Sequence, residues 1–123
     1  MAGVYELNHK GKNILCLDIA DLKTQDKTDF HKHIENAKKK IQMQPHKSIL
    51  VITNVTNIRF DSEMANSMRE YAAHNTPYVK ASALVGVSGL QKIIVQAVKK
   101  FTGRDFYLAN TMEEAKEWLV KQE

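Results

Sequence analysis

The sequence has little of several residue types, and each shortage excludes a class of protein. Its single cysteine, Cys16, excludes an internal disulfide framework and is typical of a reducing compartment. Five glycines and two prolines exclude collagen-like and low-complexity chains. No apolar run approaches the ~20 residues that cross a bilayer, and the opening stretch MAGVYELNHKGK lacks the apolar core of a signal peptide. We therefore expect a cytoplasmic protein.

The composition that remains is that of one globular domain. The chain has 123 residues, of which 43% are hydrophobic and 26% are charged, so it can bury a core without disulfides or metals. We expect a single domain over residues 1–123. Its net charge of +4 is unevenly distributed, because residues 79–104 carry five basic side chains and no acidic one. Such a segment can attract anions or a membrane surface, although it is also compatible with ordinary solvated helix faces.

Hydrophobic patterning predicts strands that alternate with helices. Apolar runs at 4–7 and 13–19, separated by a short turn, predict an antiparallel hairpin. Phe30, Ile34, Ala37 and Ile41 recur at helical spacing and predict one buried helix face. The β-branched run at 48–55 predicts a strand buried on both sides.

The second half repeats the alternation. Asp61 or Ser62 is placed to cap a helix, a strand follows at 79–87, and a helix at 90–101 ends at Gly103. A strand at 105–109 precedes a capping box, Thr111 to Glu114, and a closing helix. The fold class expected is α/β: a mixed sheet, made of an N-terminal hairpin and parallel crossover strands, covered by about four helices.

Several stretches, together with the order of elements, carry a resemblance over essentially the whole chain. They are residues 5–18, RFDSE at 59–63, AHNTPYVKA at 73–81, VGVSGL at 85–90, FTGR at 101–104 and TMEEAKEWL at 111–119. In these stretches the sequence resembles the STAS domain superfamily, and within it the SpoIIAA-like (STAS/Sec14-like) branch. The resemblance implies a SpoIIAA-like fold.

It also implies two functions of different classes. The Sec14-like comparison implies a pocket or surface for a hydrophobic, lipid-like ligand. Anti-sigma-factor antagonists instead carry a phosphorylated serine in a D-S-S-G-L motif at the start of the second helix. Here the motif is Asp61-Ser62-Glu63-Met64-Ala65, so Glu63 stands where the modified serine normally lies and the Gly-Leu pair is missing. Ser62 is then the candidate phosphorylation site, with Asp61 and Glu63 as partner contacts.

Side chains on the second and third helices suggest where a ligand would bind. Methionines form adaptable apolar walls, and these helices flank the same strands; packing in the core is the alternative role for such side chains. The expected cleft residues are Phe60, Met64, Met68, Tyr71, Leu90, Ile94 and Phe101. Free amides before the third helix and basic residues along it predict a site for an acidic group. These anion-binding candidates are Ser88, Gly89, Lys92, Lys99 and Arg104.

Other chemistries have little support in the sequence. None of the five histidines has metal-ligand spacing, and no phosphate-binding glycine motif or nucleophile elbow occurs. Nucleic-acid signatures are also missing. We therefore expect a non-enzymatic domain without metal, cofactor or nucleic acid, which binds a hydrophobic or lipid-like ligand. A peripheral membrane surface is a further candidate partner. A regulatory protein as partner is the alternative, and the sequence leaves open whether the chain is a monomer or a dimer.

Overall fold

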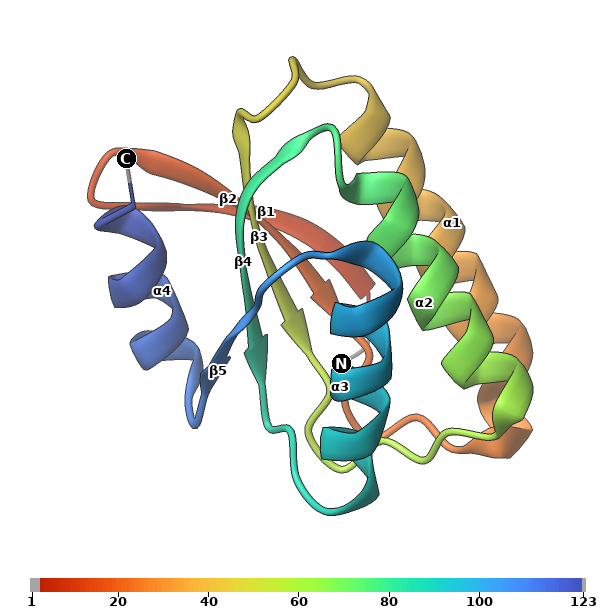
Figure 1. The fold of residues 1–123 in the computed structure, drawn as a ribbon. Coiled ribbons are helices and arrows are strands. Elements are labelled where there is room, and N and C mark those ends of the chain that lie inside the picture. Colours follow the sequence, from red (N-terminus) through yellow and green to blue (C-terminus); the bar gives the residue numbers. More distant parts are fainter. Residues whose placement is uncertain (1–2, 123) are drawn as a thin grey trace.

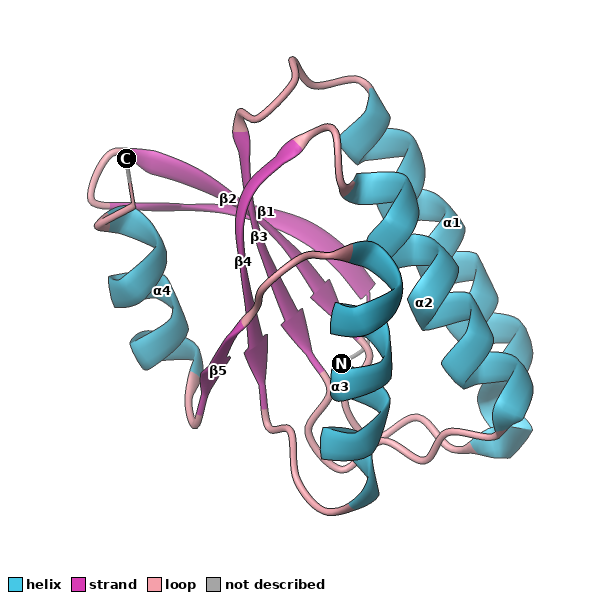
Figure 2. Cartoon of the chain, viewed as in Figure 1, coloured by secondary structure: helices cyan, strands magenta, loops and turns pink. Residues whose placement is uncertain are grey.

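The computed structural model describes residues 3–122 and has a five-stranded mixed sheet. The strands lie in chain order, and only β1 is antiparallel to its neighbour; the others are parallel. Their bounds are β1 Gly3–His9, β2 Lys12–Asp18, β3 Ile49–Asn54, β4 Val79–Val85 and β5 Tyr107–Ala109. The helices are α1 Lys27–Gln42, α2 Ser62–Asn75, α3 Leu90–Thr102 and α4 Met112–Val120, with a short 3-10 turn at Thr24–Asp26. The predicted hairpin and parallel crossovers are confirmed (Figures 1 and 2).

The sheet separates two apolar cores. Helices α1, α2 and α3 lie on one side of it, and α4 covers the other (Figure 1). Side chains alternate along β3, so that Val51 packs into the core with α1 and α2 whereas Leu50 and Ile52 pack with Leu119 of α4. The predicted α1 face is confirmed, because its four apolar residues are all buried. Since β3 has buried side chains on both faces, it lies at the centre of the domain.

The helix ends follow local chemistry. The Asp61 carboxylate accepts a hydrogen bond from the Met64 amide at 2.8 Å, which identifies Asp61 as the α2 cap. Gly103 ends α3 in the left-handed conformation, at φ 70°. Thr111 caps α4 as predicted, but Glu114 does not complete the box. Its carboxylate accepts from the Asn110 amide instead, because its other oxygen accepts from the Tyr107 hydroxyl at 2.7 Å.

None of the helices within residues 3–122 combines the length and apolar character that a membrane span requires.

Candidate functional site

A cleft lies between α2, α3 and the sheet face made by β3 and β4. Its volume is about 60 Å³, so it is narrower than the usual small-molecule pocket, and part of it opens to solvent. We call it the α2–α3 cleft. Most of its wall is apolar. Its lining residues are Val51, Thr53, Val55, Phe60, Met68, Tyr71, Ala72, Asn75, Ser82, Leu84, Gln91, Ile94, Val95, Val98, Arg104 and Phe106.

Four of the seven predicted cleft residues line this space: Phe60, Met68, Tyr71 and Ile94. The other three do not, and the reason is their position around each helix. Met64 is completely buried in the core that α2 shares with α1. Leu90 and Phe101 are 79% and 59% exposed, so solvent rather than the cleft surrounds much of each side chain. Helical spacing places residues on the same side of a helix without showing how much of that side a neighbour covers.

Several polar cleft residues were missed from the sequence. Thr53 and Ser82 lie on the cleft face of β3 and β4, and both are buried. Their signal was a hydroxyl in the middle of an otherwise apolar strand. Gln91 closes one end of the cleft, where its side-chain amide donates to the backbone oxygens of Val55 and Ile58 at 3.4 and 3.1 Å. The cleft is therefore apolar along its walls with polar groups at fixed points.

Arg104 is the charged residue of the lining set. It follows the turn at Gly103, and its guanidinium donates to the Ala72 backbone oxygen at 2.9 Å and to the Ser82 hydroxyl at 2.6 Å. The same group lies 5.0 Å from the centre of the Phe106 ring, close enough for a cation–π contact. Arg104 is partly buried, and this burial lowers the pKa of its guanidinium from the ordinary value.

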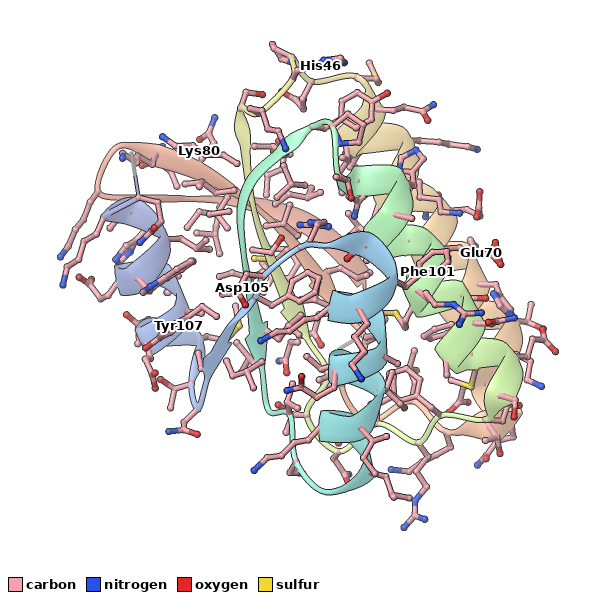
Figure 3. The ribbon with its side chains drawn as sticks, in the orientation of Figure 1. His46, Glu70, Lys80, Phe101, Asp105 and Tyr107 are labelled. Carbon is pink, nitrogen blue, oxygen red and sulfur yellow. The ribbon has the colours of Figure 1, made fainter. Side chains whose placement is uncertain are left out.

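The anion-binding candidates do not form one site. Ser88 and Gly89 precede α3 and Arg104 follows it, so the 13-residue helix, about 20 Å long, separates them. The Ser88 amide donates to the Gln91 side chain at 3.2 Å, which occupies one of the predicted free donors. Lys99 pairs with Asp105 at 3.1 Å, and Asp105 lies on the connection between α3 and β5 (Figure 3). Of this set, only Arg104 reaches the α2–α3 cleft.

The acidic residues at the start of α2 are contacted by two basic side chains of α1, Lys27 and His31. Lys27 lies 2.5 Å from the Asp61 carboxylate and 3.4 Å from that of Glu63, and His31 lies 2.9 Å from Glu63. Hydrogen bonds from Lys27 and from the Met64 amide lower the pKa of Asp61; those from His31 and Lys27 lower the pKa of Glu63. Ser62, between the two acids, is exposed.

Part of α3 exposes a row of apolar side chains, which we call the α3 outer row: Leu90, Ile93, Ala97 and Phe101. Their spacing of three, four and four residues places them on one side of the helix. Phe101 lies on the side of α3 that faces α2 (Figure 3), and its ring is contacted by Arg69 of α2, whose guanidinium carbon is 4.9 Å from the ring centre. The row is therefore a candidate interaction surface.

In the described part of the chain, no three histidine, cysteine, aspartate or glutamate side chains gather where they could hold a metal ion.

Comparisons with known proteins bear on the fold. No protein-family model matches the sequence, and no curated protein matches it. Among solved structures, the chain is similar to an uncharacterized protein of the DUF3478 family, with a SpoIIAA-like fold, from Shewanella loihica PV-4. The two share 18% sequence identity, with a TM-score of 0.65 over 97% of this chain and 95% of the other. The fold expected from the resemblance is confirmed: the chain has a SpoIIAA-like fold.

Proposed function

We propose that the protein is a non-enzymatic binding domain that holds a hydrophobic, lipid-like molecule in the α2–α3 cleft. The observation that carries the proposal is the apolar wall of the cleft, formed by Phe60, Met68, Ile94 and other apolar side chains. The cleft is narrow, about 60 Å³, so a lipid-like chain would enter as α2 and α3 move apart. Burying a ligand's apolar surface there would release about 25 cal/mol per Å². The cleft also opens to solvent, so a ligand can enter.

Two adjacent isoleucines provide a matched test. Ile94 lines the cleft, whereas Ile93 is 66% exposed on the α3 outer row. Ile94→Glu is expected to weaken binding of Nile red, a neutral apolar dye, at least about tenfold, because a carboxylate would stand inside an apolar wall. Ile93→Glu should leave dye binding unchanged. The readout is dye fluorescence, with circular dichroism to verify that both variants are folded.

Organic extracts of the purified parent protein, measured by mass spectrometry, complete the test. A co-purified lipid or saturable dye binding that Ile94→Glu removes would support the proposal. Absence of both lipid and dye binding in the parent protein would overturn it.

We also propose that the α3 outer row places the protein on anionic membranes. Leu90, Ile93 and Phe101 supply exposed apolar area, and Lys92 and Lys100 flank it. Neither lysine forms an ion pair within residues 3–122, so both charges are available to lipid headgroups. Apolar residues beside lysines on one helix are the pattern of a helix that lies in the membrane interface.

Vesicle co-sedimentation tests this surface. The protein should bind phosphatidylglycerol vesicles and bind phosphatidylcholine vesicles less, with the difference shrinking at high salt. Ile93→Glu combined with Phe101→Glu should reduce binding at least about tenfold, since each apolar side chain contributes about 1.5–3 kcal/mol when buried. Ile94→Glu is the control and should still sediment. Equal binding by the parent protein and the double variant would contradict the proposal.

A regulatory module that binds a protein through Asp61, Ser62 and Glu63 is the second candidate. The observation that favours it is that Ser62 is exposed in the first turn of α2, between Asp61 and Glu63, whose carboxylates pair with Lys27 of α1. A phosphate there would lie near the positive end of the helix dipole and near Lys27. Ser62→Asp should leave dye binding unchanged under the first proposal, and a changed set of proteins in pull-downs would favour the second.

A further inference from the structure

Two polar groups of the α2–α3 cleft have unused hydrogen-bonding capacity. The Tyr71 hydroxyl is buried and has no hydrogen bond of good geometry within residues 3–122, although Asn75 lies close enough to influence its pKa. Buried hydroxyls almost always have a partner. Arg104 has five N–H donors, and its contacts with Ala72 and Ser82 use two of them. No salt bridge to Arg104 occurs within residues 3–122, and Asp105, its neighbour in sequence, is exposed and paired with Lys99.

These two groups favour one kind of ligand atom. A guanidinium can only donate hydrogen bonds, so it requires an acceptor. Burial raises the pKa of the Tyr71 hydroxyl above its ordinary value, so this group stays protonated and can donate as well. Both groups line the same cleft, and Arg104 contacts the backbone oxygen of Ala72, the residue next to Tyr71. No acidic side chain lines the cleft, so the acceptor would come from the ligand.

The position of Arg104 indicates which end of the cleft would hold the polar end of a ligand. Its contact with Ala72 places it at the last turn of α2, whereas Phe60 precedes the first turn. The 14-residue helix is about 20 Å long, and Met68 and Ile94 line the space along it. A ligand with one polar end at Arg104 would therefore extend along an apolar wall towards Phe60.

Resting on the proposed function, we propose that the ligand is an apolar chain ending in a carboxylate, which accepts hydrogen bonds from the Arg104 guanidinium and the Tyr71 hydroxyl. A carboxylate has two acceptor oxygens and matches the planar guanidinium. Because Arg104 is already held by Ala72 and Ser82, its charge needs no reorganisation when the ligand arrives.

Calorimetric titration of the full chain with decanoate and with decanol tests the carboxylate. The two molecules have the same apolar chain and differ in the end group. Decanoate should bind at least about tenfold more tightly, because charge-assisted hydrogen bonds are roughly twice as strong as neutral ones. Equal affinities would overturn this inference.

Two variants test the residues. Tyr71→Phe removes a hydroxyl that has no hydrogen bond of good geometry in the unliganded protein, so the midpoint of urea unfolding should change little. It should weaken decanoate binding several-fold and leave decanol binding unchanged. Arg104→Gln should abolish the preference for decanoate, even if losing the contacts to Ala72 and Ser82 lowers stability. An unchanged ratio of decanoate to decanol affinity in both variants would show that Arg104 and Tyr71 serve only the fold.

The failures of the two proposals are distinguishable. If decanol and Nile red bind but decanoate has no advantage, the cleft binds apolar molecules and the carboxylate assignment is wrong. If none of the three binds, the proposed function fails and this inference fails with it.

Discussion

Met64→Glu is expected to prevent the protein from folding stably. Met64 is completely buried between α2 and α1, among apolar side chains of the core that include Phe30 and Ile34. Removing the methionine costs about 2–5 kcal/mol, and burying an unpaired carboxylate adds several more. The sum is comparable with the whole stability of a small domain, about 5–15 kcal/mol. Urea unfolding followed by circular dichroism, together with the soluble yield, measures the effect.

A second methionine on the same helix provides the control. Met68 lies one turn further along α2 but lines the α2–α3 cleft and is only partly buried. Met68→Glu can therefore direct its carboxylate towards solvent, and it should fold while losing dye binding. Met64→Leu keeps the volume and the apolar character, so it should cost less than about 1.5 kcal/mol. A folded Met64→Glu protein with an unfolding midpoint near that of the parent would contradict the packing described for α2.

These two methionines also show how far sequence patterns predict the site. Helical spacing correctly predicted that both lie on the inner side of α2. It does not distinguish a side chain that points to α1 from one that points to α3, because both directions are apolar. The same limit explains Leu90 and Phe101, whose side of α3 is apolar but uncovered. The element order, by contrast, was predictable because strand and helix periods differ strongly.

Arg104 illustrates a different limit. In sequence it belongs with Lys92 and Lys99, and together they suggested one basic surface. In the structure the chain turns at Gly103, and Arg104 enters the cleft while Lys92 stays exposed on α3. Its partners, Ala72 and Ser82, are 32 and 22 residues away, and no local pattern encodes such a contact. A charge count locates basic residues but does not separate exposed charges from a partly buried one.

Gly86→Ala is expected to lower the free energy of unfolding by about 3 kcal/mol. Gly86 follows β4 with φ at 82°, a conformation that costs a residue with a Cβ about 1–2 kcal/mol. The added Cβ would also stand 2.7 Å from the Cα of Thr56, on the loop between β3 and α2. Forcing an extra methyl into packed structure typically costs about 1–3 kcal/mol. Chemical denaturation of the variant and the parent measures the difference.

The Thr56 loop has little freedom to move away. Its backbone oxygen accepts from the Asp21 amide at 2.9 Å, and its own amide donates to the Asn54 side chain at 3.1 Å. Gly11→Ala is the matched control, because φ is 84° there and nothing lies within 4 Å of the added Cβ. It should cost about 1 kcal/mol, from the backbone conformation alone. If both variants lose the same stability, Thr56 does not oppose the methyl group. The loop that joins β3 to α2, and with it the start of α2 beside the cleft, is then less firmly held than its hydrogen bonds indicate.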